Sequence, residues 1–163
     1  MLHTVTLRPV TLADATQRYA DWLNDPEVSR FMETRWSVHT PGSITDYILS
    51  LRNSWLFAII ADNIHIGNIK LGNFSHHHQR ADVSLLIGDK AYWGRGGATH
   101  AIKEVVEIAK ARGLRKLEAG IYAPNLGSLA AFLKAGFKIE GWRDSAAAFE
   151  GGRCDVIMVG MVL

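Results

Sequence analysis

The residues with the clearest chemical potential lie in the segment GDKAYWGRGGATHA, at positions 88–101. Three glycines, Gly94, Gly96 and Gly97, fall within four residues, between an apolar run and an amphipathic helical pattern. Glycine allows tight turns and a close approach of the backbone to a ligand. The N–H groups at the start of a helix favour a phosphate or pyrophosphate. The segment is therefore a candidate anion-binding loop, and a glycine-rich connection without a ligand is the alternative.

Two better-known phosphate-binding patterns are missing from the sequence. It contains neither G-x-x-x-x-G-K-[ST] nor a G-x-G-x-x-G with an acidic residue about 20 positions further on. A nucleoside triphosphate and a Rossmann-bound dinucleotide are therefore disfavoured. A second polar pair, Asn125 and Ser128, stands at the start of a predicted helix. Both residue types favour helix N-termini, so a capping role and a binding role are compatible.

Together these segments resemble the GNAT superfamily of acetyl-CoA-dependent N-acetyltransferases, especially the branch of ribosomal-protein and amino-sugar acetyltransferases. The family's cofactor motif, [QR]-x-x-G-x-[GA], corresponds to WGRGGA at 93–98, with Trp93 in place of Gln or Arg. WLNDPEV at 22–28 and the late Glu140-Gly141 are also similar to this branch. The family's second motif corresponds to Asn125, Ser128, Phe132, Lys134, Gly136 and Phe137.

The resemblance covers nearly the whole chain and implies an α/β GNAT fold. This fold has a mixed, mostly antiparallel central sheet, helices on both faces and a central splay that holds acetyl-CoA. The backbone of 95–99 would hold the CoA pyrophosphate, and the strand edge at 86–88 would pair with the pantetheine like an added strand. The implied cofactor-binding residues are Leu86, Ile87, Gly88, Trp93, Gly94, Arg95, Gly96, Gly97, Ala98, Thr99, Asn125, Ser128, Phe132 and Lys134.

The chemistry of amine acetylation requires further groups. A lysine-like amine, with a pKa of about 10.4, is almost fully protonated at pH 7, so the site must remove a proton. Asp82 matches the position where some superfamily members carry a catalytic glutamate that acts through water; a solvent-facing carboxylate beside Arg80 is the alternative. Many members use a tyrosine as the acid where this chain has Phe132, so that role moves to Ser128 or is unfilled.

The acceptor site is expected in the N-terminal helices and in the loop 144–153 between the last two strands. Phe31, Glu33, Arg35 and Trp36 are its candidate substrate-binding residues. A carboxylate such as that of Glu33 would attract a cationic amine, whereas an acidic residue at a helix end is also common. Phe31 and Trp36 are aromatic residues that packing alone could explain.

The elements that must position these residues follow from hydrophobic periodicity. Strands are predicted at 5–8, 55–61, 64–71, 80–88, 116–122, 137–142 and 155–162. Helices are predicted at 14–22, from 98 to a stop at Gly113, and at 126–135; further helix starts are predicted at Asn24-Asp25-Pro26-Glu27 and Thr40-Pro41. The order is an antiparallel hairpin region followed by a strand–helix–strand crossover.

Composition sets the remaining limits. The 163 residues predict one domain, 1–163, and 18 Lys+Arg against 16 Asp+Glu give a net charge of only +2, so no nucleic-acid partner is expected. The single Cys154 excludes an internal disulfide, and three consecutive histidines, His76 to His78, cannot all face one metal, so no metal is expected. No membrane-spanning run and no signal at Met1–Thr4 are present, so a cytoplasmic protein is expected.

The functional prediction is direct acetyl transfer from acetyl-CoA to a primary amine in a ternary complex. A small amine, such as an amino sugar, is slightly favoured over a protein N-terminal α-amine, because the N-terminal third offers only scattered acidic residues for a basic protein partner. A non-catalytic CoA-binding sensor is the further alternative, suggested by Phe132. The oligomeric state stays open, a homodimer included.

Overall fold

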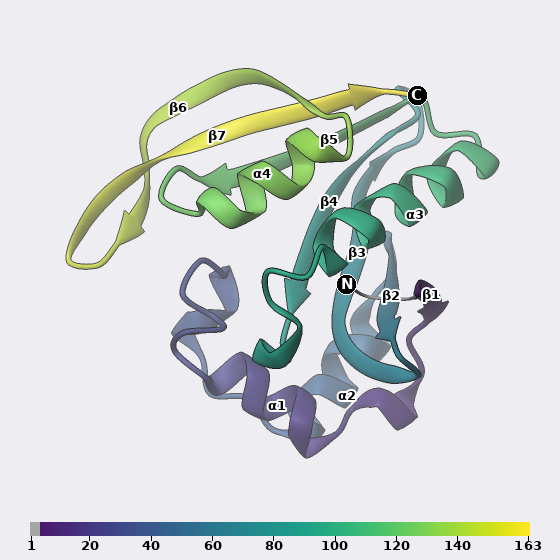
Figure 1. Ribbon diagram of the computed structural model, residues 1–163, viewed down its shortest axis with the longest axis vertical. Coiled ribbons are helices and arrows are strands. Elements are labelled where there is room, and N and C mark those ends of the chain that lie inside the picture. Colours follow the sequence, from purple (N-terminus) through teal and green to yellow (C-terminus); the bar gives the residue numbers. More distant parts are fainter. Residues whose placement is uncertain (1–3) are drawn as a thin grey trace.

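The computed structural model describes residues 4–163 and has a seven-stranded sheet with helices on both faces (Figure 1). The strand order is β1-β2-β3-β4-β5-β7-β6, and β4–β5 is the parallel pair in an otherwise antiparallel sheet. The strands are β1 (Val5–Pro9), β2 (Ser54–Ala61), β3 (Ile64–Ser75), β4 (Arg80–Ile87), β5 (Lys116–Tyr122), β6 (Lys138–Phe149) and β7 (Gly152–Val162). The helices are α1 (Gln17–Asn24), α2 (Pro41–Ser50), α3 (Gly97–Ala111) and α4 (Leu126–Lys134), with short 3-10 helices η1 (Leu12–Asp14), η2 (Glu33–Trp36) and η3 (Lys90–Tyr92).

The two halves of the sheet diverge between β4 and β5 (Figure 1). Their pairing joins Arg80–Asp82 to Lys116–Glu118 and goes no further within the described residues. Over 83–87, β4 pairs with β3 on its other edge, so its edge toward β5 carries no strand. This opening is the central splay that the sequence predicts.

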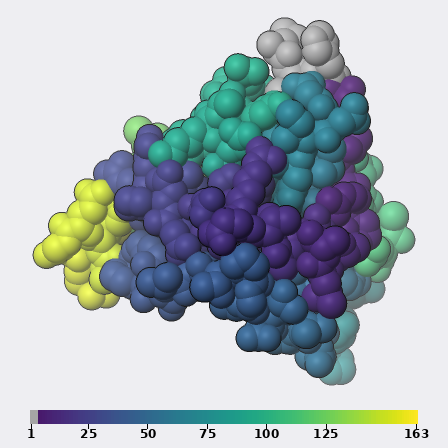
Figure 2. Space-filling model, turned by 90° about the horizontal axis from the view of Figure 1, so that it is seen from below, coloured from purple at the N-terminus to yellow at the C-terminus, as the bar shows by residue number. Residues whose placement is uncertain are grey.

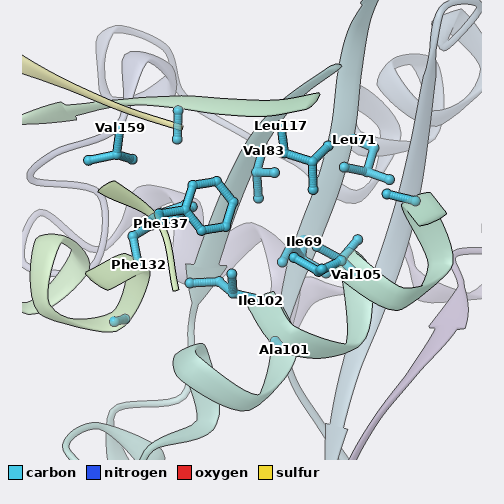
Figure 3. Packing of buried hydrophobic residues seen from close by; sticks show 14 of the residues in the cluster. Ile69, Leu71, Val83, Ala101, Ile102, Val105, Leu117, Phe132, Phe137 and Val159 are labelled. Carbon is cyan, nitrogen blue, oxygen red and sulfur yellow. The ribbon is translucent and has the colours of Figure 1, made fainter. Parts of the chain in front are cut away.

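Helices α3 and α4 cover one face of the sheet. Alternate residues of β2, β3, β4 and β5 point to this face and form the larger core (Figure 3). Ile102 and Val105 of α3 are fully buried there, and each such side chain contributes about 1.5–3 kcal/mol on burial. Phe132 of α4 packs edge-to-face on Phe137, with ring centroids 5.0 Å apart. The cofactor motifs therefore belong to the main core.

Helices α1 and α2 cover the opposite face and form a smaller core with Leu86. Threonine side chains cap both helices: Thr16 accepts from Tyr19 N, and Thr40 accepts from Ser43 N. Gly88 lies under Trp22, and an added Cβ would stand 2.0 Å from the indole ring. Contacts at the end of β4 thus hold the N-terminal helices against this strand.

Three predicted boundaries are wrong. The first helix begins at Gln17, and Asp14 lies in η1 with its carboxylate held by Arg8. The segment 24–27 forms a turn, because the Asp25 carboxylate accepts from Glu27 N and from Lys90 and so closes a local turn. Strand β6 continues to Phe149, and β7 already begins at Gly152. Most of 144–153 is therefore strand, where the sequence predicts a loop.

Within residues 4–163 no helix is long and apolar enough to cross a membrane. The prediction that there is no signal peptide rests on Met1–Thr4. Positions 1–3 of this segment lie outside the described residues.

Candidate active site

A cavity of about 640 Å³ opens where β4 and β5 diverge. Its walls come from β3, β4, β5 and α4, and from the N-terminal segment that includes α1, η2 and α2. The residues that line it include Tyr19, Phe31, Glu33, Tyr47, Asn68, Lys70, Ser84, Leu85, Leu86, Gly120, Tyr122, Asn125, Ser128 and Phe132. Motifs from distant parts of the sequence therefore meet in one space.

The glycine loop follows β4 at the mouth of the splay. Gly94 and Gly96 have φ of +71° and +85°, which is the left-handed region that favours glycine, and Gly96 is the N-cap of α3. The Trp93 indole donates to the carbonyl of Ile87 at 2.8 Å. This contact ties the loop to the end of β4, so Trp93 has a structural role in the position where the family motif has Gln or Arg.

The backbone N–H groups from Gly94 to Thr99 have no hydrogen-bond acceptor within the described residues. The next donor, His100 N, already bonds to Gly96 O at 3.1 Å as part of the helix. Six consecutive free donors at the start of a 15-residue helix form a concave site for an anion. This geometry agrees with the predicted anion-binding loop.

The second motif begins α4 at the edge of the cavity. Asn125 is the N-cap, and its Oδ1 accepts from Ser128 N at 3.2 Å, as the capping interpretation predicts. Asn125 and Ser128 also line the cavity. Phe132 lines it and is buried, whereas Lys134 is exposed and lies outside the cavity lining.

A polar cluster, Glu33–Tyr122–Arg35, closes the cavity on the η2 side. The Tyr122 hydroxyl donates to the Glu33 carboxylate, and Arg35 Nη1 donates to the Tyr122 oxygen at 3.2 Å. Burial, followed by the hydrogen bond to Glu33, raises the pKa of Tyr122 above its ordinary value. Glu33 is the only carboxylate that lines the cavity within residues 4–163.

Arg35 is engaged by the protein itself. Its Nη1 donates to Met32 O at 2.6 Å and its Nη2 to Ala148 O at 2.7 Å, so it links η2 to the β6–β7 hairpin. Arg35 and Trp36 line an adjoining hollow, which shares Leu23, Ser37 and Val38 with the cavity, and do not line the cavity itself. Of the four predicted acceptor residues, Phe31 and Glu33 therefore reach the cavity, while Arg35 and Trp36 do not.

The tip of the hairpin packs beside the N-terminal segment (Figure 2). Phe31 stacks on Phe149 with ring centroids 5.4 Å apart, and Arg30 pairs with Glu150 at 2.6 Å. These contacts hold Phe31 in the cavity wall by packing, which is the alternative to a substrate-binding role given above for this aromatic residue. They also join the two diverging halves of the sheet.

A family model described as an acetyltransferase (GNAT) domain matches residues 4–138. The chain belongs to the GNAT acetyltransferase family. The match spans the glycine loop and also β4, β5 and α4, which contribute residues to the cavity lining. It therefore confirms the family resemblance read from the two motifs, and the mixed sheet confirms the predicted GNAT fold.

Known relatives agree with this membership. YwnH of Bacillus subtilis, provisionally assigned as a phosphinothricin acetyltransferase, is 34% identical over 87 residues, which are 53% of this chain and 53% of YwnH. The match thus spans about half the length of this curated relative. Spermidine N-acetyltransferase from Vibrio cholerae, solved with CoA and spermine, has the same fold, with a TM-score of 0.84 and 17% identity over 97% of this chain and 95% of that one. RimJ from Mycobacterium smegmatis, solved with CoA-disulfide, has a TM-score of 0.85 and 23% identity, over 97% of this chain and 81% of the RimJ chain.

Asp82, the predicted base of this GNAT protein, lies outside the cavity lining. It stands two residues before Ser84 on the same face of β4, about 7 Å away, and accepts from Asn73 Nδ2 at 2.9 Å. It can therefore reach the cavity only through water. His76, His77 and His78 lie in the β3–β4 turn, and no metal-binding group of His, Cys, Asp and Glu occurs within the described residues.

Sequence reasoning missed many cavity residues of this GNAT protein, among them the polar Tyr47, Lys70 and Tyr122. Tyr122 and Lys70 lie on predicted strands, and period-2 alternation could have assigned them to the face opposite the main core. The sequence carries no signal for Tyr47, because its position at the cavity depends on how α2 packs.

Proposed function

We propose that this GNAT protein is an acetyl-CoA-dependent N-acetyltransferase that acetylates a primary amine. The observation that carries the proposal is the free edge of β4, which lines the cavity over 83–86 and leads along the chain to the row of free N–H donors. An extended chain with amide groups fits the edge of β4 at 83–87, and its pyrophosphate fits the donors of 94–99. CoA has both features. The CoA-bound relatives described above support the same assignment.

The acceptor amine enters from the side of η2. Glu33 binds it as an ammonium ion and takes its proton; the nitrogen lone pair then forms the new C–N bond at the thioester carbonyl. The nitrogen, now bonded to the carbonyl carbon, releases its second proton to solvent. The C–S bond breaks, its electrons leave with the sulfur, and the thiolate takes a proton from Ser128, which solvent restores. Free backbone N–H groups of β4 near Leu85 would stabilise the developing negative charge on the carbonyl oxygen.

We assign the base to Glu33 because it lines the cavity, and Asp82 does not. The earlier prediction for Asp82 requires a water chain past Ser84, and it remains the competing assignment. No cysteine lines the cavity within the described residues; the free Cys154 lies on β7. This arrangement supports direct transfer in a ternary complex.

We favour a small amine over a protein N-terminus. A single carboxylate lines the cavity within residues 4–163, and the segment 30–36 packs against the hairpin tip, which narrows the approach for a polypeptide. An acidic cleft, which a basic protein substrate would favour, is not present in the described residues.

The test is an acetylation assay that follows thiol release from acetyl-CoA. The acceptor panels are amino sugars, amino acids, polyamines, aminoglycosides and N-terminal peptides. We expect turnover on small amines and little on peptides. CoA binding without turnover on any panel would identify the protein as a sensor, and preferred turnover of peptides would identify a protein N-terminal acetyltransferase.

A further inference from the structure

The cavity carries one positive charge that the proposed chemistry does not use. Lys70, on β3, is the only Lys or Arg among the cavity-lining residues within 4–163. Its Nζ donates to the Tyr47 hydroxyl at 3.2 Å and lies 5.7 Å from the centre of that ring. It forms no ion pair with a described residue. A partly buried ammonium beside a neutral hydroxyl therefore faces the cavity with its charge unneutralised.

The neighbours of Lys70 are also hydrogen-bond donors. Ser84 stands directly opposite it on β4, on the same face, and also lines the cavity. Asn68, two residues earlier on the same strand face, is only 4% exposed, and its Nδ2 has no hydrogen-bond partner within the described residues. Burying an amide without a partner costs about 1–3 kcal/mol. On this wall of the cavity, Ser84 and Lys70 thus provide an accessible hydroxyl donor and a cation.

The opposite wall of the cavity carries a negative charge, that of the Glu33 carboxylate. Glu33 stands beside Tyr122 on β5, whereas Lys70 lies on β3, on the far side of β4. Neighbouring strands are about 4.8 Å apart, so the two charges face the cavity from positions roughly 10 Å apart or more. The splay, where the proposed attack occurs, lies between them.

We propose that Lys70, with Tyr47 and Ser84, binds an anionic group of the acceptor. The acceptor is then an amine that carries a carboxylate or a phosphate within roughly 5–10 Å of its nitrogen. This inference rests on the proposed function, because it assumes that the amine lies at Glu33. A polyamine fits poorly, since its second ammonium would lie beside Lys70 and be repelled.

The test compares pairs of amines that differ by one anionic group. 6-Aminohexanoate against pentylamine tests a carboxylate, and glucosamine 6-phosphate against glucosamine tests a phosphate. The ratio of kcat/KM within each pair is measured for the wild type, Lys70→Met and Lys70→Arg. Comparing these ratios between variants cancels the different basicities of the amines. Lys103→Met, which removes an exposed α3 lysine without a described partner, is the matched control.

We expect Lys70→Met to reduce the preference for the anionic partner about tenfold, mainly through KM, because the contact is made in the ground state as well as in the transition state. Lys70→Arg should keep most of the preference, and Lys103→Met all of it. The pair that responds identifies the group as carboxylate or phosphate. An equal preference in wild type and Lys70→Met for both pairs would overturn the inference.

Failure of the proposed function gives a different result. If no amine is acetylated, calorimetry with the CoA-loaded protein still measures the affinity for glucosamine 6-phosphate against glucosamine and for 6-aminohexanoate against pentylamine. Tighter binding of an anionic partner that Lys70→Met abolishes supports the site without catalysis. Equal binding within both pairs overturns it.

Discussion

The Glu33 carboxylate and the Tyr122 hydroxyl meet across 89 positions of sequence. If Glu33 receives the amine and its proton, Glu33→Gln should lower kcat/KM about 10²–10⁴-fold, the range for loss of a general base. Tyr122→Phe should lower it less, because the carboxylate remains and only its orientation is lost. Steady-state kinetics as a function of pH measures both effects.

The matched control for Glu33→Gln is Glu104→Gln, an exposed α3 glutamate outside the cavity, which should leave the kinetics unchanged. Asp82→Asn separates the two assignments of the base. If Asp82→Asn loses activity mainly at neutral pH and Glu33→Gln does not, the water-mediated role of Asp82 is correct and ours is wrong.

Asp14 tests the electrostatics of the N-terminal core. Arg8 holds it with two hydrogen bonds of 2.7 and 2.8 Å, and this interaction, reinforced by Thr11 N, lowers the pKa of the buried carboxyl to about 2. Asp14→Asn should destabilise the fold by about 1–3 kcal/mol at pH 7, because Arg8 loses its charged partner. Since the pKa is lower in the folded state, the stabilisation is complete above about pH 4 and disappears as the pH falls toward 2.

Urea denaturation of wild type and Asp14→Asn between pH 2 and 7 measures this difference. The two curves of unfolding free energy against pH should converge at the acidic end. A difference that stayed constant down to pH 2 would show that the carboxylate's charge contributes nothing and that only its shape matters.

At the scale of elements, we expect the turn before α3 to determine cofactor binding. Gly96 has φ of +85°, which a β-branched residue tolerates only at a cost of about 1–3 kcal/mol, so Gly96→Val should distort the row of N–H donors and abolish CoA binding. Isothermal calorimetry with CoA checks this prediction.

Gly113→Val is a control for the backbone strain that a β-branched residue causes at a positive φ. Gly113 has a similar φ of +81°, but it lies just beyond the other end of α3, with no atom near an added Cβ. Gly113→Val should cost comparable stability and leave CoA affinity intact. If Gly96→Val bound CoA normally, the loop would not be the pyrophosphate site.

The elements that carry the cofactor site could be predicted closely from the sequence. The apolar alternation of 116–122 predicts both ends of β5, and the glycines predict the start of α3 to within one residue. These signals are local, because periodicity and glycine geometry act within one element. The prediction at Asp25-Pro26 is wrong because an aspartate that caps a turn and one that caps a helix use the same side-chain acceptor.

The length of β6 could not be predicted for another reason. Its polar residues interrupt the strand pattern, but a bulge at Ser145, with φ of +48°, lets the pairing continue. Ser145 N donates to Asp155 on the partner strand at 2.8 Å, and Arg153 Nε donates to Ser145 O at 2.6 Å. Those partners become visible only when the hairpin is assembled.

At the scale of the molecule, contacts outside the sheet help to hold its two halves together. Arg35→Met removes the link between η2 and Ala148, so we expect a loss of about 1.5–3 kcal/mol for its charged hydrogen bonds and a higher KM for the amine. CoA affinity should change little, because the glycine loop is untouched. Thermal denaturation and steady-state kinetics measure the two effects.

Arg143→Met is the comparison for Arg35→Met, because Arg143 is an exposed arginine on β6 with no described hydrogen bond or ion pair. It should leave stability and KM unchanged. Equal behaviour of the two variants would mean that the Arg35 link does not hold the halves together. The part of the cavity that these long-range contacts build is the hardest to predict from sequence patterns. Arg35 is predicted for the acceptor site and does not line the cavity, whereas Tyr122 lines it and is not predicted.

The free edge of β4 has a further consequence for the protein without its ligand. An unpaired strand edge is a template onto which another extended chain can add, and proteins usually cover or interrupt such edges. In the proposed function, residues 83–87 must stay open to pair with the cofactor, so a charge or a proline there would weaken CoA binding. The fold instead places this edge in the cavity between two halves of the sheet, which restricts the approach of a neighbouring protein's strand. Binding and protection against aggregation are therefore two results of the same divergence of β4 and β5.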